Sequence, residues 1–94
     1  MALARVVSFD GVSTERVAQM EQEFSSQEQP EGVRATEMVM LHDPDAEKAV
    51  VVLFFDSEAD YNDADAVLSA MPTDETPGRR TAAGKYNVAV RMKA

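Results

Sequence analysis

Residues 49–55 form an uninterrupted apolar run, Ala-Val-Val-Val-Leu-Phe-Phe. A membrane-spanning helix needs about 20 apolar residues, so this run is too short to cross a bilayer, and we expect no membrane partner. Its β-branched and aromatic content predicts a buried strand. Because neither face of this strand is polar, we expect both sides of its sheet to be covered. A charge at either Val51 or Val52 would then enter an apolar layer.

A short connection places a second strand beside this run. Residues 33–42 are strand-like, and apolar side chains fall on both of their faces. The Asp-Pro-Asp sequence at residues 43–45 then supplies a turn. The link from Asp43 to about Lys48 is too short for a helical crossover, so it predicts an antiparallel hairpin.

The remaining elements follow from turn and capping signals. A first strand, Leu3–Phe9, ends at an Asp-Gly turn, and Ser13 caps a helix that Pro30 and Gly32 stop. Ser57 caps a second helix, which Pro72 ends. The apolar positions of these helices recur at helical spacing: Val17, Met20 and Phe24 in the first, and Tyr61, Ala64, Leu68 and Met71 in the second.

The last strand is expected over Lys85–Lys93, after a loop at residues 73–83, because polar and apolar residues alternate there. The order β-α-β-β-α-β predicts a single α+β domain over residues 1–94. In this ferredoxin-like arrangement, two helices cover one face of a four-stranded antiparallel sheet. The other face of the sheet then needs a partner, and a chain of 94 residues without cysteine gains stability by burying more surface in a homodimer.

Composition excludes several classes of function. The chain has no cysteine and a single histidine, which removes thiolate catalysis, zinc fingers and two-histidine metal sites, so we expect no metal and no cofactor. Met1–Asp10 lacks the apolar core of a secretory signal, which favours a cytoplasmic location.

Charge is distributed unevenly along the sequence. All 17 acidic residues fall within residues 1–78 with 4 basic ones, whereas residues 79–94 carry 5 basic residues and no acid. An acidic body repels phosphate backbones, so we expect no nucleic-acid partner. The basic set instead balances the acid-rich segment 56–65. It consists of Arg79, Arg80, Lys85, Arg91 and Lys93.

The hydrophobic run 50–55, continuing into Asp-Ser-Glu-Ala-Asp at 56–60 and Leu-Ser-Ala-Met-Pro at 68–72, resembles the dimeric α+β barrel superfamily. The nearest branch is similar to the antibiotic biosynthesis monooxygenases. This resemblance implies a homodimer whose sheets pack face to face, with a cleft between helices and sheet in each subunit. The Asn, Trp and His set of the haem-degrading members does not carry over, because the chain has no tryptophan and His42 lies on a strand.

Two functions follow from these observations. The first is a homodimeric protein that binds a small apolar or aromatic molecule in the helix–sheet cleft, without a recognisable catalytic set. The alternative is a cofactor-independent monooxygenase or isomerase acting on a small aromatic or polyketide-like substrate. The expected ligand contacts are apolar helix residues and three polar strand residues: Met20, Phe24, Tyr61, Leu68 and Met71, with Arg34, His42 and Tyr86. The same apolar residues could equally pack as a solid core without a ligand.

Overall fold

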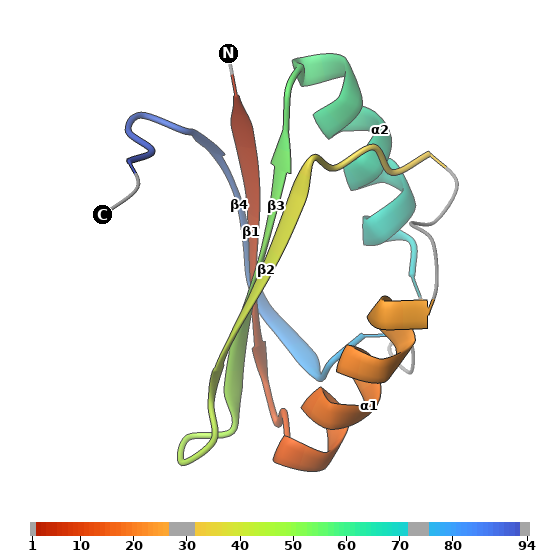
Figure 1. The fold of residues 1–94 in the computed structure, drawn as a ribbon, viewed down its shortest axis with the longest axis vertical. Coiled ribbons are helices and arrows are strands. Elements are labelled where there is room, and N and C mark those ends of the chain that lie inside the picture. The colour runs from red at the N-terminus through yellow and green to blue at the C-terminus, as the bar shows by residue number, and fades with distance from the viewer. Residues whose placement is uncertain (1, 27–31, 72–75, 93–94) are drawn as a thin grey trace.

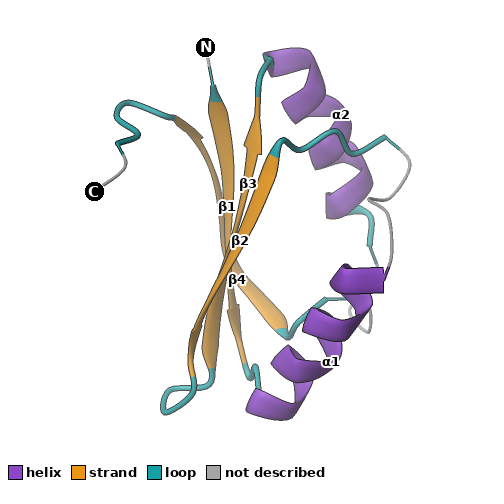
Figure 2. Ribbon diagram, in the orientation of Figure 1, coloured by secondary structure: helices purple, strands orange, loops and turns teal. Residues whose placement is uncertain are grey.

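The computed structural model describes residues 2–26, 32–71 and 76–92. The elements follow in the order β1 (Leu3–Asp10), α1 (Thr14–Ser26), β2 (Glu37–Asp43), β3 (Lys48–Phe55), α2 (Glu58–Ser69) and β4 (Arg79–Asn87). The strands form one antiparallel sheet in the order β2-β3-β1-β4. Both helices lie on the same side of this sheet (Figures 1 and 2). The predicted α+β fold with a four-stranded antiparallel sheet is therefore confirmed.

The turn and helix-capping residues expected from the sequence make the corresponding hydrogen bonds in the structure. Asp43 Oδ1 accepts hydrogen bonds from the backbone N–H groups of Asp45 and Ala46, which closes the β2–β3 hairpin turn. Ser13 Oγ accepts from the backbone N–H of Arg16, and Ser57 Oγ accepts from that of Asp60. These two bonds satisfy free N–H groups at the starts of the helices. The end of α1 expected at Pro30 lies outside the described residues.

Strand register determines which side chains face the helices. Leu3 pairs with Phe55 and Val7 with Val51, so the odd-numbered residues of β1 and β3 point towards α1 and α2. Two core clusters form on this side, one around Phe55 and one around Val7. The opposite side, which we call the open face, carries the even-numbered residues of β1 and β3, the odd-numbered residues of β2, and Ala82, Gly84 and Tyr86 of β4. The register shift between Ser8 and Phe9 places Arg79 on this face as well, beside Asp10. The larger apolar side chains of the open face are Val6, Val39, Leu41, Val50, Val52, Phe54 and Tyr86.

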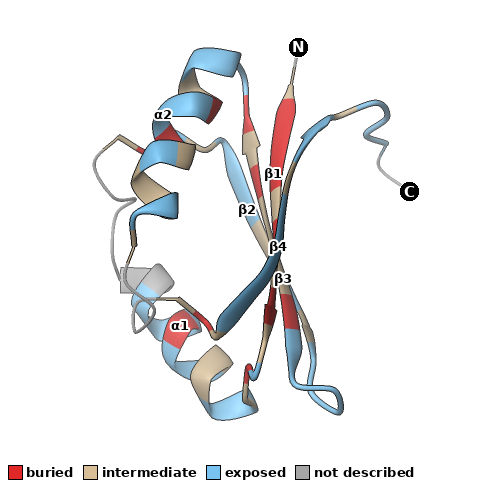
Figure 3. Cartoon of the chain, turned by 180° about the vertical axis from the view of Figure 1, so that it is seen from behind, coloured by how far each residue is buried: buried red, intermediate tan, exposed pale blue. Residues whose placement is uncertain are grey.

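The last strand differs from the sequence expectation. It spans Arg79–Asn87. The strand therefore begins and ends earlier than the expected Lys85–Lys93, and it takes in residues 79–83, which were expected to form the end of a loop. The register explains this difference, because Asn87 pairs with Leu3, the first residue of β1. Beyond Asn87, one backbone bond continues the contact, from the Val88 N–H to the Ala2 carbonyl. The strand is a sheet edge whose residues are mostly exposed (Figure 3), so it needs no apolar alternation.

The second strand also starts later than expected, at Glu37 rather than Val33. Val33 is buried in the core cluster with Tyr61 and Ala64 of α2. Its apolar character reflects packing in a connecting segment, which a strand-like pattern alone does not distinguish. Within the described residues, no helix is long and apolar enough to span a membrane.

Candidate functional site

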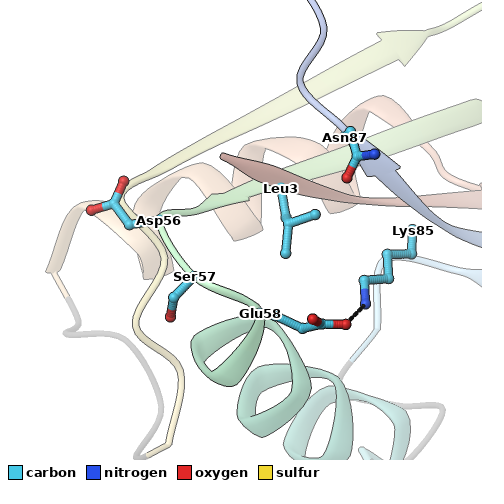
Figure 4. Close-up of a pocket in the computed structure, with 6 residues that line it drawn as sticks. All are labelled: Leu3, Asp56, Ser57, Glu58, Lys85 and Asn87. Carbon is cyan, nitrogen blue, oxygen red and sulfur yellow. Dashed lines mark hydrogen bonds and ion pairs between the residues drawn. The ribbon is translucent and has the colours of Figure 1, made fainter. Parts of the chain in front are cut away.

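A pocket of about 380 Å³ lies between the start of α2 and the adjoining ends of β1 and β4 (Figure 4). Leu3 is its buried apolar side chain. The other lining residues are polar and exposed: Asp56, Ser57, Glu58, Lys85 and Asn87. The pocket thus has an apolar base and a rim of hydrogen-bonding groups.

Two features of the fold assemble this lining. The chain leaves β3 at Phe55 and enters α2 through its N-cap, Ser57, which brings one side of the rim to the end of the sheet. On the other side, Lys85 pairs with Arg5 and Asn87 with Leu3, so both β4 side chains share the helix-facing side. The pocket therefore lies between helix and sheet, at one end of the sheet.

Lys85 links the two walls of the pocket. Its Nζ donates a hydrogen bond of 2.7 Å to Glu58 Oε1, seen as the dashed line in Figure 4. This hydrogen bond, and then the charge of Lys85, lower the pKa of Glu58. The same Nζ lies 5.0 Å from the centre of the Tyr61 ring, a cation–π distance. The lysine therefore joins the exposed rim to the aromatic core beneath it.

Tyr61 is the buried residue beneath this rim. Its ring meets that of Phe55 edge to face, with 5.7 Å between centroids and 75° between planes. Burial raises the pKa of Tyr61, the charge of Asp65 raises it further, and the cations Arg5 and Lys85 oppose both effects. The phenol is thus held in its neutral form, in which it can donate a hydrogen bond.

Arg5 is the buried charged residue of the described chain. Its Nε donates to Asp65 Oδ1 at 3.0 Å, and its Nη2 lies 3.5 Å from Ser69 Oγ, both on α2. No role for Arg5 was expected from the sequence. The alternation of β1 could have indicated that Arg5 is buried. Arg5 is an odd-numbered residue, like Leu3, Val7 and Phe9, so its side chain falls on the core-facing side of the strand.

The apolar residues expected to contact a ligand mostly fall on the helix side. Met20 and Tyr61 are buried, whereas Leu68 and Met71 are half-buried. Tyr61 and Leu68 meet in one core cluster. The side chain of Phe24 lies outside the described part of the structure. The four described side chains belong to the packed interior on the helix side of the sheet, and none of these four lines the pocket.

The three polar residues expected beside them are not brought together. Arg34 is exposed and pairs at 3.5 Å with two carboxylates of α2, Asp60 and Asp63. His42 Nε2 lies 2.9 Å from the Val12 carbonyl oxygen, which fits a strand-end residue tied to the neighbouring turn. Tyr86 lies on the open face, with 58% of its surface exposed and its ring over Gly84. The register therefore turns Tyr86 away from the helices.

The basic C-terminal residues pair in part as expected. Lys85 reaches the acid-rich segment through Glu58. Arg79 instead pairs with Asp10, and Arg91 with Glu37, because these acids lie on the strands at the two ends of the sheet. Arg80 Nη2 donates to the Leu68 carbonyl at 3.4 Å, near the end of α2. Lys93 lies outside the described residues.

Among residues 2–26, 32–71 and 76–92, no group of three or more His, Asp or Glu side chains is arranged to hold a metal ion. No protein-family model matches the sequence, and a search of curated proteins finds no significant match. The functional argument therefore depends on the geometry of the pocket and on the surface of the sheet.

Proposed function

We propose that the chain is a homodimeric small-molecule-binding protein and that the ligand enters the pocket between α2 and the β1–β4 edge. The observation that carries this proposal is the lining of that pocket. Small-molecule sites combine apolar contact with a few convergent polar groups in a volume of roughly 300–1,000 Å³. Here Leu3 offers the apolar contact, and Ser57, Lys85 and Asn87 offer polar groups from two elements, around about 380 Å³.

The open face supports the homodimer. Its centre is formed by valines and Phe54, and the exposed Leu41 and Tyr86 flank them. A contiguous exposed apolar surface on a small domain indicates a contact surface. A two-fold dimer buries one such face against its own copy.

The connectivity supports the finer part of the proposal. The element order β-α-β-β-α-β and the strand order β2-β3-β1-β4 fit a ferredoxin-like arrangement, whose helices leave one sheet face uncovered. Two such faces in contact would form a dimeric α+β barrel. The pocket lies on the helix side, so each subunit would keep its own site after the dimer has formed.

A screen with small aromatic and polyketide-like compounds tests the binding site. We expect some compounds to shift the backbone NMR signals of Leu3, Ser57, Lys85 and Asn87. The variant Asn87→Trp fills the pocket and should abolish these shifts. Asn62→Trp is the matched control, because Asn62 is exposed on α2 and does not line the pocket. The proposal fails if no compound binds, or if binding survives in Asn87→Trp.

A further inference from the structure

The segment that follows β4 turns to the open-face side of the sheet (Figure 1). We call residues 88–92 the C-terminal arm. Its first residue is held by the hydrogen bond of 3.0 Å from the Val88 N–H to the Ala2 carbonyl. Further along, Arg91 Nη2 lies 3.3 Å from Glu37 Oε2, and the guanidinium carbon lies 4.1 Å from the centre of the Phe54 ring. The arm is thus attached to Ala2, the residue before β1, and to β2 and β3.

The two apolar side chains beside Arg91 are largely exposed to solvent in the single chain. Val90 is 75% exposed and Met92 is 83% exposed, although Arg91 between them is anchored to the sheet. Most of the exposed large hydrophobic residues gather on this side. Leu41 and Tyr86 on the open face join the two arm residues, whereas Met38 has the helix-facing parity of β2.

We propose that Val90 and Met92 of each copy pack against the second copy of the chain, so that the two arms clamp the dimer. This inference rests on the proposed homodimer through the open face. It adds a named segment to that contact and makes the arm part of the interface.

Charge indicates why the occupant is a second copy. In a two-fold dimer each surface contacts an identical surface of the other copy. A net charge on that surface would therefore be repelled by the same charge on the partner. The middle of the open face is apolar, and the charged groups at its ends are three acids and three cations, which sum to zero. Glu37 pairs with Arg91, Asp10 pairs with Lys48 and Arg79, and Asp43 lies opposite Lys48 in the register. The chain as a whole carries a formal charge of −8, so two copies repel at long range. Additional apolar area from the arms offsets this repulsion.

Sedimentation analysis across protein concentrations tests the arm. The double variant Val90→Ser/Met92→Ser should raise the dimer dissociation constant by about a hundredfold, because each lost apolar side chain is lost twice in a two-fold dimer. Met38→Ser is the matched control, since it removes an exposed large apolar side chain on the helix-facing side. Its dissociation constant should equal that of the wild type.

Wild-type sedimentation separates the two proposals. A wild-type chain that stays monomeric overturns the homodimer and with it the clamp. A dimeric wild type whose dissociation constant is unchanged in the double variant overturns the clamp alone. Thermal unfolding of the double variant should match that of a wild-type sample dilute enough to be monomeric, because both side chains are solvent-exposed in the single chain.

A spin label gives a second, positional readout. The chain has no cysteine, so Met92→Cys offers a single attachment site. Labelled variant is mixed with unlabelled wild type that carries methyl isotopes. We expect broadening of the open-face methyl groups of Val6, Val50 and Val52 in the isotope-labelled copy that is stronger than the broadening of the helix-facing Val7. Equal broadening of both groups, or none in a dimeric sample, overturns the clamp.

Discussion

At the scale of single residues, Arg5 decides how α2 meets the sheet. It is a charged side chain on the core-facing side of β1, and the acceptors that satisfy it, Asp65 and Ser69, both come from α2. A buried cation is tolerated only when its hydrogen bonds are made, so helix and strand must keep a fixed relative position. The partly exposed Asp65 completes the arrangement at the surface.

Arg5→Ala should lower the free energy of unfolding by about 2–3 kcal/mol, because it removes charge-assisted hydrogen bonds and the packing of the side-chain stem. The control Arg34→Ala breaks two exposed ion pairs and should cost less than about 1 kcal/mol. Urea unfolding at one protein concentration measures both values. Equal decreases in the free energy of unfolding of the two variants would show that the buried Arg5 contributes no more to stability than the exposed Arg34.

The phenol of Tyr61 should titrate above its ordinary value of 10.0, since burial and the charge of Asp65 both raise its pKa. The chain has two tyrosines, so Tyr86→Phe leaves Tyr61 as the sole phenol in an ultraviolet titration. Adding Asp65→Asn should lower the midpoint, whereas Asp63→Asn should leave it unchanged.

The sign for stability follows from the same shift. Because the pKa of Tyr61 is higher in the folded than in the unfolded chain, the protonated phenol contributes stability, and this contribution is complete at any pH below the unfolded pKa. This contribution is lost as pH rises from the unfolded towards the folded value. The free energy of unfolding should therefore decrease above about pH 10. A Tyr61 midpoint at or below the ordinary value would contradict the burial of this ring.

At the scale of elements, local chemistry made some features predictable and non-local pairing hid others. The hairpin turn and both serine caps involve residues three or fewer positions apart, so the sequence alone indicates them. The position of β4 depends on where β1 begins, 84 residues away at the Leu3–Asn87 pair. The pocket is equally non-local, because Lys85 and Glu58 meet only through sheet register and the start of α2. Alternation in one segment carries no information about such pairs.

The cap of α2 gives a direct test at this scale. Ser57→Ala should reduce the free energy of unfolding by about 1 kcal/mol, since it leaves the Asp60 N–H without its side-chain acceptor. Ser57→Thr keeps a hydroxyl at the same position and should recover most of the loss. Chemical unfolding of the three proteins checks this order. A threonine variant as unstable as the alanine variant would mean that the hydroxyl does not cap the helix.

At the scale of the whole molecule, the two faces of β3 lie in different environments. The apolar run 49–55 predicted that both faces are covered, and the structure assigns one face to the helices and leaves the other as the open face. Val51 packs against both core clusters beneath α1 and α2. Val52, the next residue, lies on the open face beside Val6 and Val39. Adjacent positions of β3 therefore belong to different surfaces, one in the helix–sheet core and one on the open face that we propose as the dimer interface.

Val51→Asp should destabilise the fold by several kcal/mol, roughly 3–5, because it places an unpaired charge in the helix–sheet core. Val52→Asp places the same charge on a face that water reaches in the single chain. It should give a folded protein with native circular dichroism that sediments as one chain of 10.3 kDa. A dimeric Val52→Asp protein would exclude the open face as the interface. A Val51→Asp protein of wild-type stability would contradict the assigned sheet parity. The two outcomes are independent, since the first variant tests how the chain packs on itself and the second tests how it packs on its copy.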